Sequence, residues 1–175
     1  MKILVFSLVA LFGLPLAFAA NDARGMFLVV KGEVTVKRAE TSSPAKAGFK
    51  VFSGDIITAG KDSRAKIGMK DHNVISVSPD TTFTIVNYVQ GANRNVELEL
   101  KSGKIRNDVQ NSYDGEKNKF IIKTPTAVAG VRGTDFITSF DVGTNVTTVT
   151  TLKGRVELTN AAGKTVSIGA GMNSS

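Results

Sequence analysis

The stretch Val96-Glu97-Leu98-Glu99-Leu100 alternates apolar and acidic residues with a period of two. This alternation is typical of a β-strand that has one buried face and one solvent face. The segments Glu33–Lys37 and Arg64–Met69 show the same pattern. After residue 24, no window of ten or more residues has apolar side chains at the spacing of an amphipathic helix. The sequence therefore predicts an all-β protein.

Turn-forming residues divide the rest of the chain into further strands. These strands are rich in Val, Ile, Thr and Phe, as half-buried strands are. They are expected at residues 73–78, 82–88, 119–124, 134–140, 145–152, 155–159 and 164–168. Short strands separated by turns every 8 to 12 residues favour an antiparallel β-sandwich or jelly-roll-like single domain, with a β-solenoid as the alternative.

A glycine step recurs within the strands, and two polar stretches interrupt them. The step occurs at Lys31-Gly32-Glu33-Val34, Ser102-Gly103-Lys104-Ile105 and Lys153-Gly154-Arg155-Val156. Its spacing is uneven, so we interpret it as repeated use of a bulge glycine and not as a sequence repeat. Arg38–Lys46 and Asn107–Asn118 are interpreted as long surface loops.

The N-terminus has the three parts of a secretory signal peptide, which we assign to residues 1–20. Lys2 precedes an apolar run from Ile3 to Leu14, and small residues suit cleavage after Ala19. The run is too short for a typical membrane span, and no later segment could be one. We therefore expect a periplasmic or secreted protein with no membrane span after cleavage. An uncleaved N-terminal anchor is the alternative.

Composition excludes several classes of site. The chain has no cysteine, which rules out disulfides, thiolate metal ligands and a lipid-modified cysteine. Loss of Lys2 with the signal leaves 21 basic residues against 15 acidic ones. This balance would attract an anionic cell-wall polymer, although outward lysines also protect strand edges. Nucleic acid is not expected as a partner, because the chain is expected to be exported and has no recognisable nucleic-acid-binding motif.

No catalytic, cofactor-binding or metal-binding set is visible in the sequence. The single histidine, His72, lies in an expected exposed turn without a nearby catalytic partner. Carboxylates occur at turns, where Asp bonds backbone amides. They are Asp55, Asp62, Asp71 and Asp80. A carbohydrate-active enzyme that pairs two of these carboxylates after folding is the least favoured alternative.

The most distinctive stretch runs from Lys123 to Phe136. Pro125 has no backbone N–H to donate to a neighbouring strand, so the strand that precedes it should end there or lie at the edge of a sheet. Gly130 and Gly133 permit backbone shapes closed to other residues and predict a tight turn. Arg132 and Asp135 bracket this turn and could pair with each other or bond backbone carbonyls. The stretch is interpreted as a corner of the sandwich, with a ligand site as the alternative.

The chain resembles the FecR domain family of bacterial envelope proteins. The resemblance rests on two blocks, Ser53 to Ile85 and Thr124 to Phe136, and extends from about residue 25 to 171, which we take as the domain. The motif residues, expected to be structural, are Gly54, Asp55, Thr124, Pro125, Thr126, Gly130, Arg132, Gly133, Thr134, Asp135 and Phe136. One departure is Asp71-His72-Asn73, where members of the family tend to have Asp-Gly; only the turn type is affected.

The resemblance implies a β-sandwich or jelly-roll fold, no catalytic activity and no cofactor. Because the expected domain follows a signal peptide directly, we expect a stand-alone secreted member. Its expected function is non-catalytic binding of an envelope protein or a cell-wall polymer, through strand edges and the two polar loops. An accessory role in FecR-type transmembrane signalling of iron uptake is the alternative.

Overall fold

The computed structural model describes residues 22–113 and 118–175. The predicted signal peptide, residues 1–20, therefore lies outside the described residues. The described part is all-β, which confirms the predicted fold class. Its strands are β1 (Gly25–Lys31), β2 (Val34–Arg38), β3 (Thr41–Pro44), β4 (Lys50–Val51), β5 (Ile56–Ala59), β6 (Arg64–Met69), β7 (Val74–Val77), β8 (Thr81–Val89), β9 (Asn95–Asp108), β10 (Lys119–Lys123), β11 (Ala127–Val131), β12 (Asp135–Asp141), β13 (Val146–Lys153), β14 (Arg155–Asn160), β15 (Thr165–Gly169) and β16 (Asn173–Ser174).

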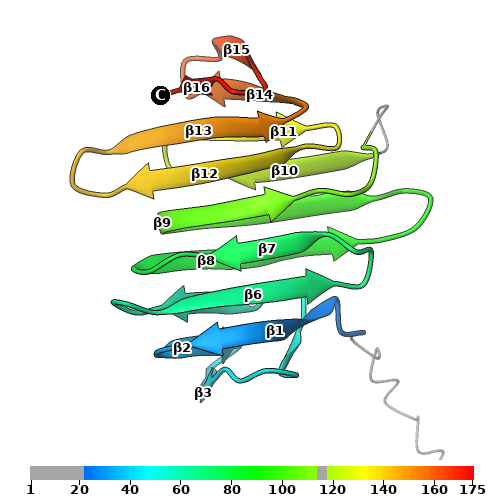
Figure 1. The fold of residues 1–175 in the computed structure, drawn as a ribbon, viewed down its shortest axis with the longest axis vertical. Helices are drawn as coiled ribbons and strands as arrows, with labels where there is room; N and C mark the ends of the chain where they lie inside the picture. Colours follow the sequence, from blue (N-terminus) through cyan, green and yellow to red (C-terminus); the bar gives the residue numbers. More distant parts are fainter. Residues whose placement is uncertain (1–21, 114–117) are drawn as a thin grey trace, which may run out of the picture.

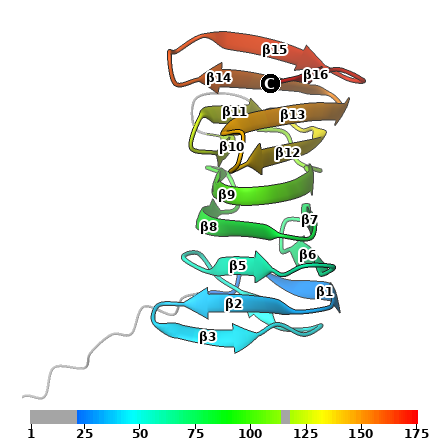
Figure 2. The same ribbon diagram turned by 90° about the vertical axis from the view of Figure 1, so that its left-hand side faces the viewer.

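The strands stack in two layers that face each other (Figures 1 and 2). Layer A contains β1, β4, β6, β7, β12, β13 and β16. Layer B contains β2, β3, β5, β8, β10, β11, β14 and β15. The chain passes from one layer to the other as it advances along the stack, from β1 and β2 at one end to β15 and β16 at the other (Figure 2).

The long strand β9 belongs to both layers. Its first part pairs with β8 and β10 in layer B, and its second part, from Gly103, pairs with β7 and β12 in layer A. The pairing of β9 with β10 is parallel, whereas the other pairs of the described strands are antiparallel. The two layers are therefore joined through β9 into one continuous hydrogen-bonded sheet.

One hydrophobic core fills the space between the layers. Val96, Leu98 and Leu100 are fully buried in it. The acidic residues that alternate with them, Glu97 and Glu99, lie on the half-exposed outer face of layer B. Each fully buried aliphatic side chain of this size stabilises the fold by about 1.5–3 kcal/mol. The period-two alternation of the sequence thus predicts correctly which side chains form the core.

The recurrent glycine step marks the corners where the chain changes layer. Gly103 has a φ of +83°, and an added Cβ there would overlap the hydroxyl of Thr81 and lie 2.5 Å from the carbonyl oxygen of Asp80. The Thr81 hydroxyl, fully buried, accepts a hydrogen bond of 2.9 Å from the amide of Lys104. Gly32 lies in the same way beside Ser63, whose hydroxyl accepts a bond of 2.8 Å from the amide of Glu33. Gly154 lies beside Thr134, whose hydroxyl instead donates to the carbonyl of Arg155 at 3.0 Å. Only a residue without a side chain fits these corners.

The predicted loop Arg38–Lys46 is wrong in part, because it contains β3. This strand pairs with β2 in a hairpin that turns through Ala39, whose φ is +50°. The sequence of β3 is polar and carries no apolar alternation, since its residues lie at the edge of layer B and bury little. In the second predicted loop, Asn107–Asn118, β9 continues to Asp108. Across residues 22–113 and 118–175 there is no helix with the length and hydropathy of a membrane span.

Candidate functional site

The first family block places Asp55 in a buried ion pair. Asp55 is fully buried, and its carboxylate receives hydrogen bonds from Arg38 Nε (2.7 Å) and Nη2 (2.8 Å). The backbone amide of Phe52 donates a third bond of 2.9 Å to the same group. The hydrogen bonds with Asp55 raise the pKa of Arg38, whose guanidinium also lies 4.1 Å from the centre of the Phe52 ring. Asp55 therefore anchors the beginning of β5 to the end of β2.

Gly54, which precedes Asp55, lies in the turn that leads into β5. Its φ is +91°, and its amide donates a hydrogen bond of 2.6 Å to the carbonyl of Ile85 on β8. A left-handed conformation of this kind is one that glycine adopts without steric cost. Gly54 and Asp55 together shape the turn before β5.

The Thr124-Pro125-Thr126 segment forms the turn between β10 and β11. The hydroxyl of Thr124 accepts a bond of 3.0 Å from the amide of Ala127, and the hydroxyls of Thr124 and Thr126 lie 2.6 and 2.7 Å from that of Thr147 on β13. Pro125 is exposed, and β10 ends two residues before it, as predicted. This turn of layer B is thus fastened to layer A.

The two motif glycines differ in conformation. Gly133 has a φ of +88°, and an added Cβ would lie 3.2 Å from the carbonyl oxygen of Asn111. Gly130, by contrast, lies inside β11 with no positive φ, and the nearest atom to an added Cβ would be the carbonyl oxygen of Glu157, at 4.0 Å. The prediction that Gly130 permits a special backbone shape is therefore wrong. The tight turn belongs to Gly133 alone, because Gly130 is still within the ladder with β10 and β14.

The predicted pairing of Arg132 with Asp135 is also wrong. Asp135 is 7% exposed and accepts bonds of 2.8 and 2.7 Å from Nε and Nη2 of Arg106 on the neighbouring strand β9. Gly133 carries the chain from layer B to layer A, so the two residues on either side of it belong to different layers. Asp135 lies on layer A beside β9, whereas the exposed Arg132 follows β11 at the surface of layer B.

The remaining motif residues hold this crossing in place. The Thr134 hydroxyl donates to the carbonyl of Arg155 (3.0 Å), and the Thr134 carbonyl accepts a bond from the amide of Val109 (3.1 Å). Phe136 is fully buried and packs edge-on against Phe120, with ring centres 6.3 Å apart. The interpretation of the Thr124–Phe136 stretch as a corner of the sandwich fits these contacts.

A buried polar cluster beside this corner was not foreseen from the sequence. Asn73 is 2% exposed, and its Nδ2 donates to Asp71 and to the hydroxyls of Tyr88 and Tyr113, each at 3.0 Å. The Tyr88 hydroxyl donates to Asp71 at 3.0 Å, and the Tyr113 hydroxyl at 3.3 Å. Burial, and next the negative charge of Asp71, raise the pKa of both tyrosines. The signal in the sequence was the departure from the family pattern at Asp71-His72-Asn73, because Asp71 and Asn73 both belong to this cluster.

The polar cluster attaches the segment after β9 to the rest of the fold. The amide of Gln110 donates to Asn73 Oδ1 at 2.9 Å, and Asn111 Nδ2 donates to the carbonyl of Asp71 at 2.6 Å. The Tyr113 ring packs edge-on against Phe120, with centres 5.4 Å apart. The segment is therefore held against the beginning of β10.

The turn carboxylates do not form a shared site among the described residues. Asp62 and Asp80 are exposed and have positive φ values, Asp55 is paired with Arg38, and Asp71 accepts the tyrosine hydroxyls. His72 is exposed in its turn, as predicted. Within residues 22–113 and 118–175, no group of three or more His, Asp or Glu residues is placed to hold a metal ion.

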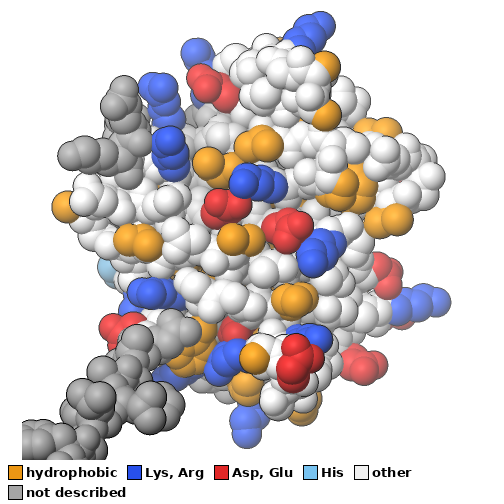
Figure 3. Space-filling view, turned by 180° about the vertical axis from the view of Figure 1, so that it is seen from behind, with side chains coloured by type: hydrophobic (Ala, Val, Ile, Leu, Met, Phe, Trp, Pro, Cys, Tyr) orange, Lys and Arg blue, Asp and Glu red, His pale blue; other side chains and the backbone are white. Residues whose placement is uncertain are grey.

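A hollow of about 650 Å³ lies on the outer face of layer B, over β10, β11 and β14. We call it the basic hollow, because three exposed cationic residues line it: Lys119, Arg132 and Arg155. Glu157 contributes a single carboxylate. Figure 3 shows the layer B face, where Lys and Arg side chains gather at the upper left, near the beginning of β10. The family motif contributes Gly130, Arg132 and Gly133 to this lining.

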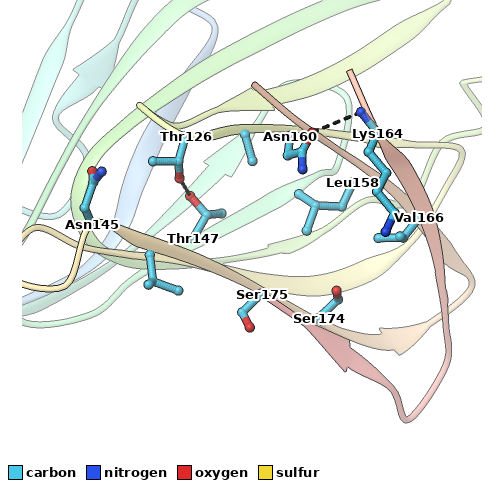
Figure 4. Close-up of a pocket in the computed structure, with 11 residues that line it drawn as sticks. Thr126, Asn145, Thr147, Leu158, Asn160, Lys164, Val166, Ser174 and Ser175 are labelled. Atoms are coloured by element: carbon cyan, nitrogen blue, oxygen red, sulfur yellow. Dashed lines mark hydrogen bonds between the residues drawn. The ribbon is translucent and has the colours of Figure 1, made fainter. Parts of the chain in front are cut away.

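A second hollow, of about 430 Å³, lies at the end of the stack between β11, β13 and β14 (Figure 4). It contains the Thr126–Thr147 contact described above and the bond from the amide of Lys164 to Asn160 Oδ1 (3.0 Å). Asn160 Oδ1 also accepts a bond from the amide of Ala162, so it holds the β14–β15 turn. The side chains of Thr126, Thr147 and Asn160 are thus engaged in shaping the fold.

Comparison with known proteins identifies one family and one fold. The family model described as FecR protein matches residues 55–157. Two crystal structures of a proposed anti-sigma factor from Parabacteroides distasonis ATCC 8503, at 1.65 and 2.50 Å resolution, are similar to the chain with a TM-score of 0.56, at 18% and 17% identity. The matches cover 67% of this chain and 52% of those proteins, so the chain corresponds to about half of their length. No curated protein matches the chain. At this identity, the structural likeness is one of fold.

Proposed function

We propose that this chain, which belongs to the FecR protein family, is a non-catalytic envelope domain that binds a partner protein. One observation carries the proposal. Most polar side chains of the family motif, such as Asp55 and Asp135, are used in bonds that hold the strands together. Three motif residues, Gly130, Arg132 and Gly133, line the basic hollow, a concave surface suited to binding. Function must be argued from such a site, since one fold serves many functions.

The proposed location is the periplasm or the outside of the cell. It rests on the signal-peptide pattern of residues 1–20, with cleavage after Ala19. The proposed domain extends over residues 25–171 and thus beyond both ends of the matched 55–157 region. The strands outside the match, such as β1 and β15, pair with strands inside it, which supports this extent.

In-cell photo-cross-linking tests the binding role. A photoreactive residue at Val128, which is 37% exposed on β11, reports on the layer B face, and one at Met26, 46% exposed on β1, reports on layer A. We expect a cross-linked envelope protein from at least one face of the tagged chain, identified by mass spectrometry. Capture of cell-wall polymer alone, or no capture from either face, would overturn the proposal.

An accessory role in FecR-type transmembrane signalling of iron uptake is the second candidate. The observation that favours it is the fold shared with the proposed anti-sigma factor, combined with family membership. Deletion of the gene should then change transcription of a defined set of genes, and re-expression of the chain should restore it. An unchanged transcript profile under iron limitation would count against this role.

A further inference from the structure

We infer that the basic hollow binds an acidic, extended segment of the partner protein, and that Gly130 is the point where this segment comes closest to layer B. The inference rests on the proposed function, because it names the chemistry of the partner. It concerns the outer face of β10, β11 and β14, which no contact within the described part of the fold covers.

The absence of a side chain at Gly130 is not required by the fold. Glycine inside a strand lowers stability relative to other residues, because it loses more backbone entropy and packs no side chain. The backbone of Gly130 has no positive φ, and an added Cβ would meet its first neighbour only at 4.0 Å. A glycine inside a strand often marks a bulge, a bend or the close approach of a ligand or another backbone, and the pairing of β11 with β10 and β14 has no register shift at Gly130.

The charges around Gly130 select an anion. Lys119, Arg132 and Arg155 line the hollow, and none of them has a carboxylate of the described residues within ion-pair distance. The guanidinium groups of Arg38 and Arg106, in contrast, are each paired with a carboxylate. A free guanidinium suits a carboxylate well, because it donates two parallel hydrogen bonds to it.

The apolar lining of the basic hollow and its single carboxylate favour a peptide over an anionic polymer as the ligand. Ile121, which is half-buried on the outer face of β10, gives the hollow apolar surface that a highly charged polymer would leave uncovered. Phe120 and Tyr113 are only 1% and 2% exposed, so they offer no ring face on which a sugar could stack. Glu157 repels a uniformly negative chain but can accept a bond from a peptide amide.

The mode of binding follows from the pairing of β11. Both edges of this strand are hydrogen-bonded, to β10 on one side and β14 on the other. The partner therefore cannot join layer B as an added strand at this place, and recognition depends on side chains. A volume of about 650 Å³ accommodates a few residues of an extended chain.

A display experiment tests the inference with the mature full chain. A random peptide library displayed on phage is first passed over the Gly130→Val variant, to remove phage that bind elsewhere, and the remaining phage are selected on the wild type. Valine favours strands and would fill the hollow with its side chain. We expect the recovered peptides to be enriched in Asp and Glu and to bind about tenfold more weakly to Arg132→Glu, as loss of a charge-assisted bond predicts. Lys66→Glu, an exposed change on layer A, serves as the matched control and should leave binding unchanged.

Each other outcome contradicts the inference. Peptides without acidic enrichment, or acidic peptides that bind Arg132→Glu and Gly130→Val as well as the wild type, would overturn it. Stronger binding of polyphosphate than of any selected peptide, lost in the same variants, would assign the hollow to a polymer instead. Arg132→Glu carries the test if Gly130→Val fails to fold. Protein capture in cells from another face, with no peptide bound here, would remove the inference but leave the proposed function intact.

Discussion

Arg106 on β9 and Asp135 on β12 form a two-bond ion pair, with Nε–Oδ1 and Nη2–Oδ2 distances of 2.8 and 2.7 Å. The carboxylate is 7% exposed, whereas half of the arginine side chain is exposed. The pair lies where the second family block enters layer A, directly after the crossing at Gly133. It fixes the register of β9 and β12 at the point where β12 begins.

Replacing Arg106 by Ala should lower the free energy of unfolding by about 1–3 kcal/mol, because it leaves the Asp135 carboxylate without its two donors. The partial exposure of Arg106 keeps the effect below that of a fully buried pair. Urea denaturation measures it. Arg132→Ala is the matched control and should change stability by less than about 0.5 kcal/mol. Equal losses in the two variants would show that Arg132 also supports the fold.

Replacing Gly103 by Ala should destabilise the fold by about 2–4 kcal/mol. A positive φ costs a residue with a Cβ about 1–2 kcal/mol, and the overlap with Asp80 and Thr81 adds to this. Gly130→Ala is the control, since it has space and an ordinary backbone, and we expect it to be neutral or slightly stabilising. Thermal unfolding of both variants separates the two kinds of glycine; a destabilised Gly130→Ala would contradict the reading of the hollow.

Replacing Thr81 by Val should cost about 1–3 kcal/mol, because the amide of Lys104 loses its buried acceptor while the shape of the side chain is kept. Thr82→Val removes a hydroxyl whose partner, Thr58, lies 3.3 Å away in an exposed contact, and should have little effect. Chemical denaturation of the two neighbouring variants tests the corner. If Thr81→Val is as stable as Thr82→Val, the Thr81 hydroxyl does not stabilise the corner at Gly103.

The two tyrosines of the polar cluster predict a loss of stability at alkaline pH. Because the pKa values of Tyr88 and Tyr113 are raised in the folded state, the unfolded chain releases these protons first, above pH about 10. Their contribution is therefore complete below that pH and is lost as pH rises toward the folded values, by about 1.4 kcal/mol per pH unit for each tyrosine.

Tyrosinate absorbance during an alkaline titration tests this prediction, because the chain contains only these two tyrosines. We expect tyrosinate to appear together with the loss of tertiary structure seen by near-ultraviolet circular dichroism. Lysines titrate in the same range, so the Tyr88→Phe and Tyr113→Phe double variant provides the comparison. Its stability should fall less steeply with pH. Tyrosinate in a protein that is still folded would refute the raised pKa values.

The all-β fold and the core could be predicted from residues such as Val96, Leu98 and Leu100, because strand alternation decides which side chains are buried within a single segment. The corner at Thr124–Phe136 and the end of β10 shortly before Pro125 could also be predicted, because proline and glycine restrict or free the backbone locally. The strand β3 was missed because an edge strand buries too little to leave an apolar pattern in the sequence.

By itself, the sequence determined the fold class, the family and the absence of a local catalytic motif, since these depend on patterns within short segments. Only the tertiary structure decided which charges meet. Asp135 pairs with Arg106, 29 residues before it, and not with Arg132, because the intervening crossing at Gly133 places neighbours in sequence on different layers. The same crossing leaves Arg132 exposed beside Gly130, where strands distant in sequence bring it together with Arg155. Partners that are set by strand pairing across such distances cannot be read from the spacing of residues along the chain.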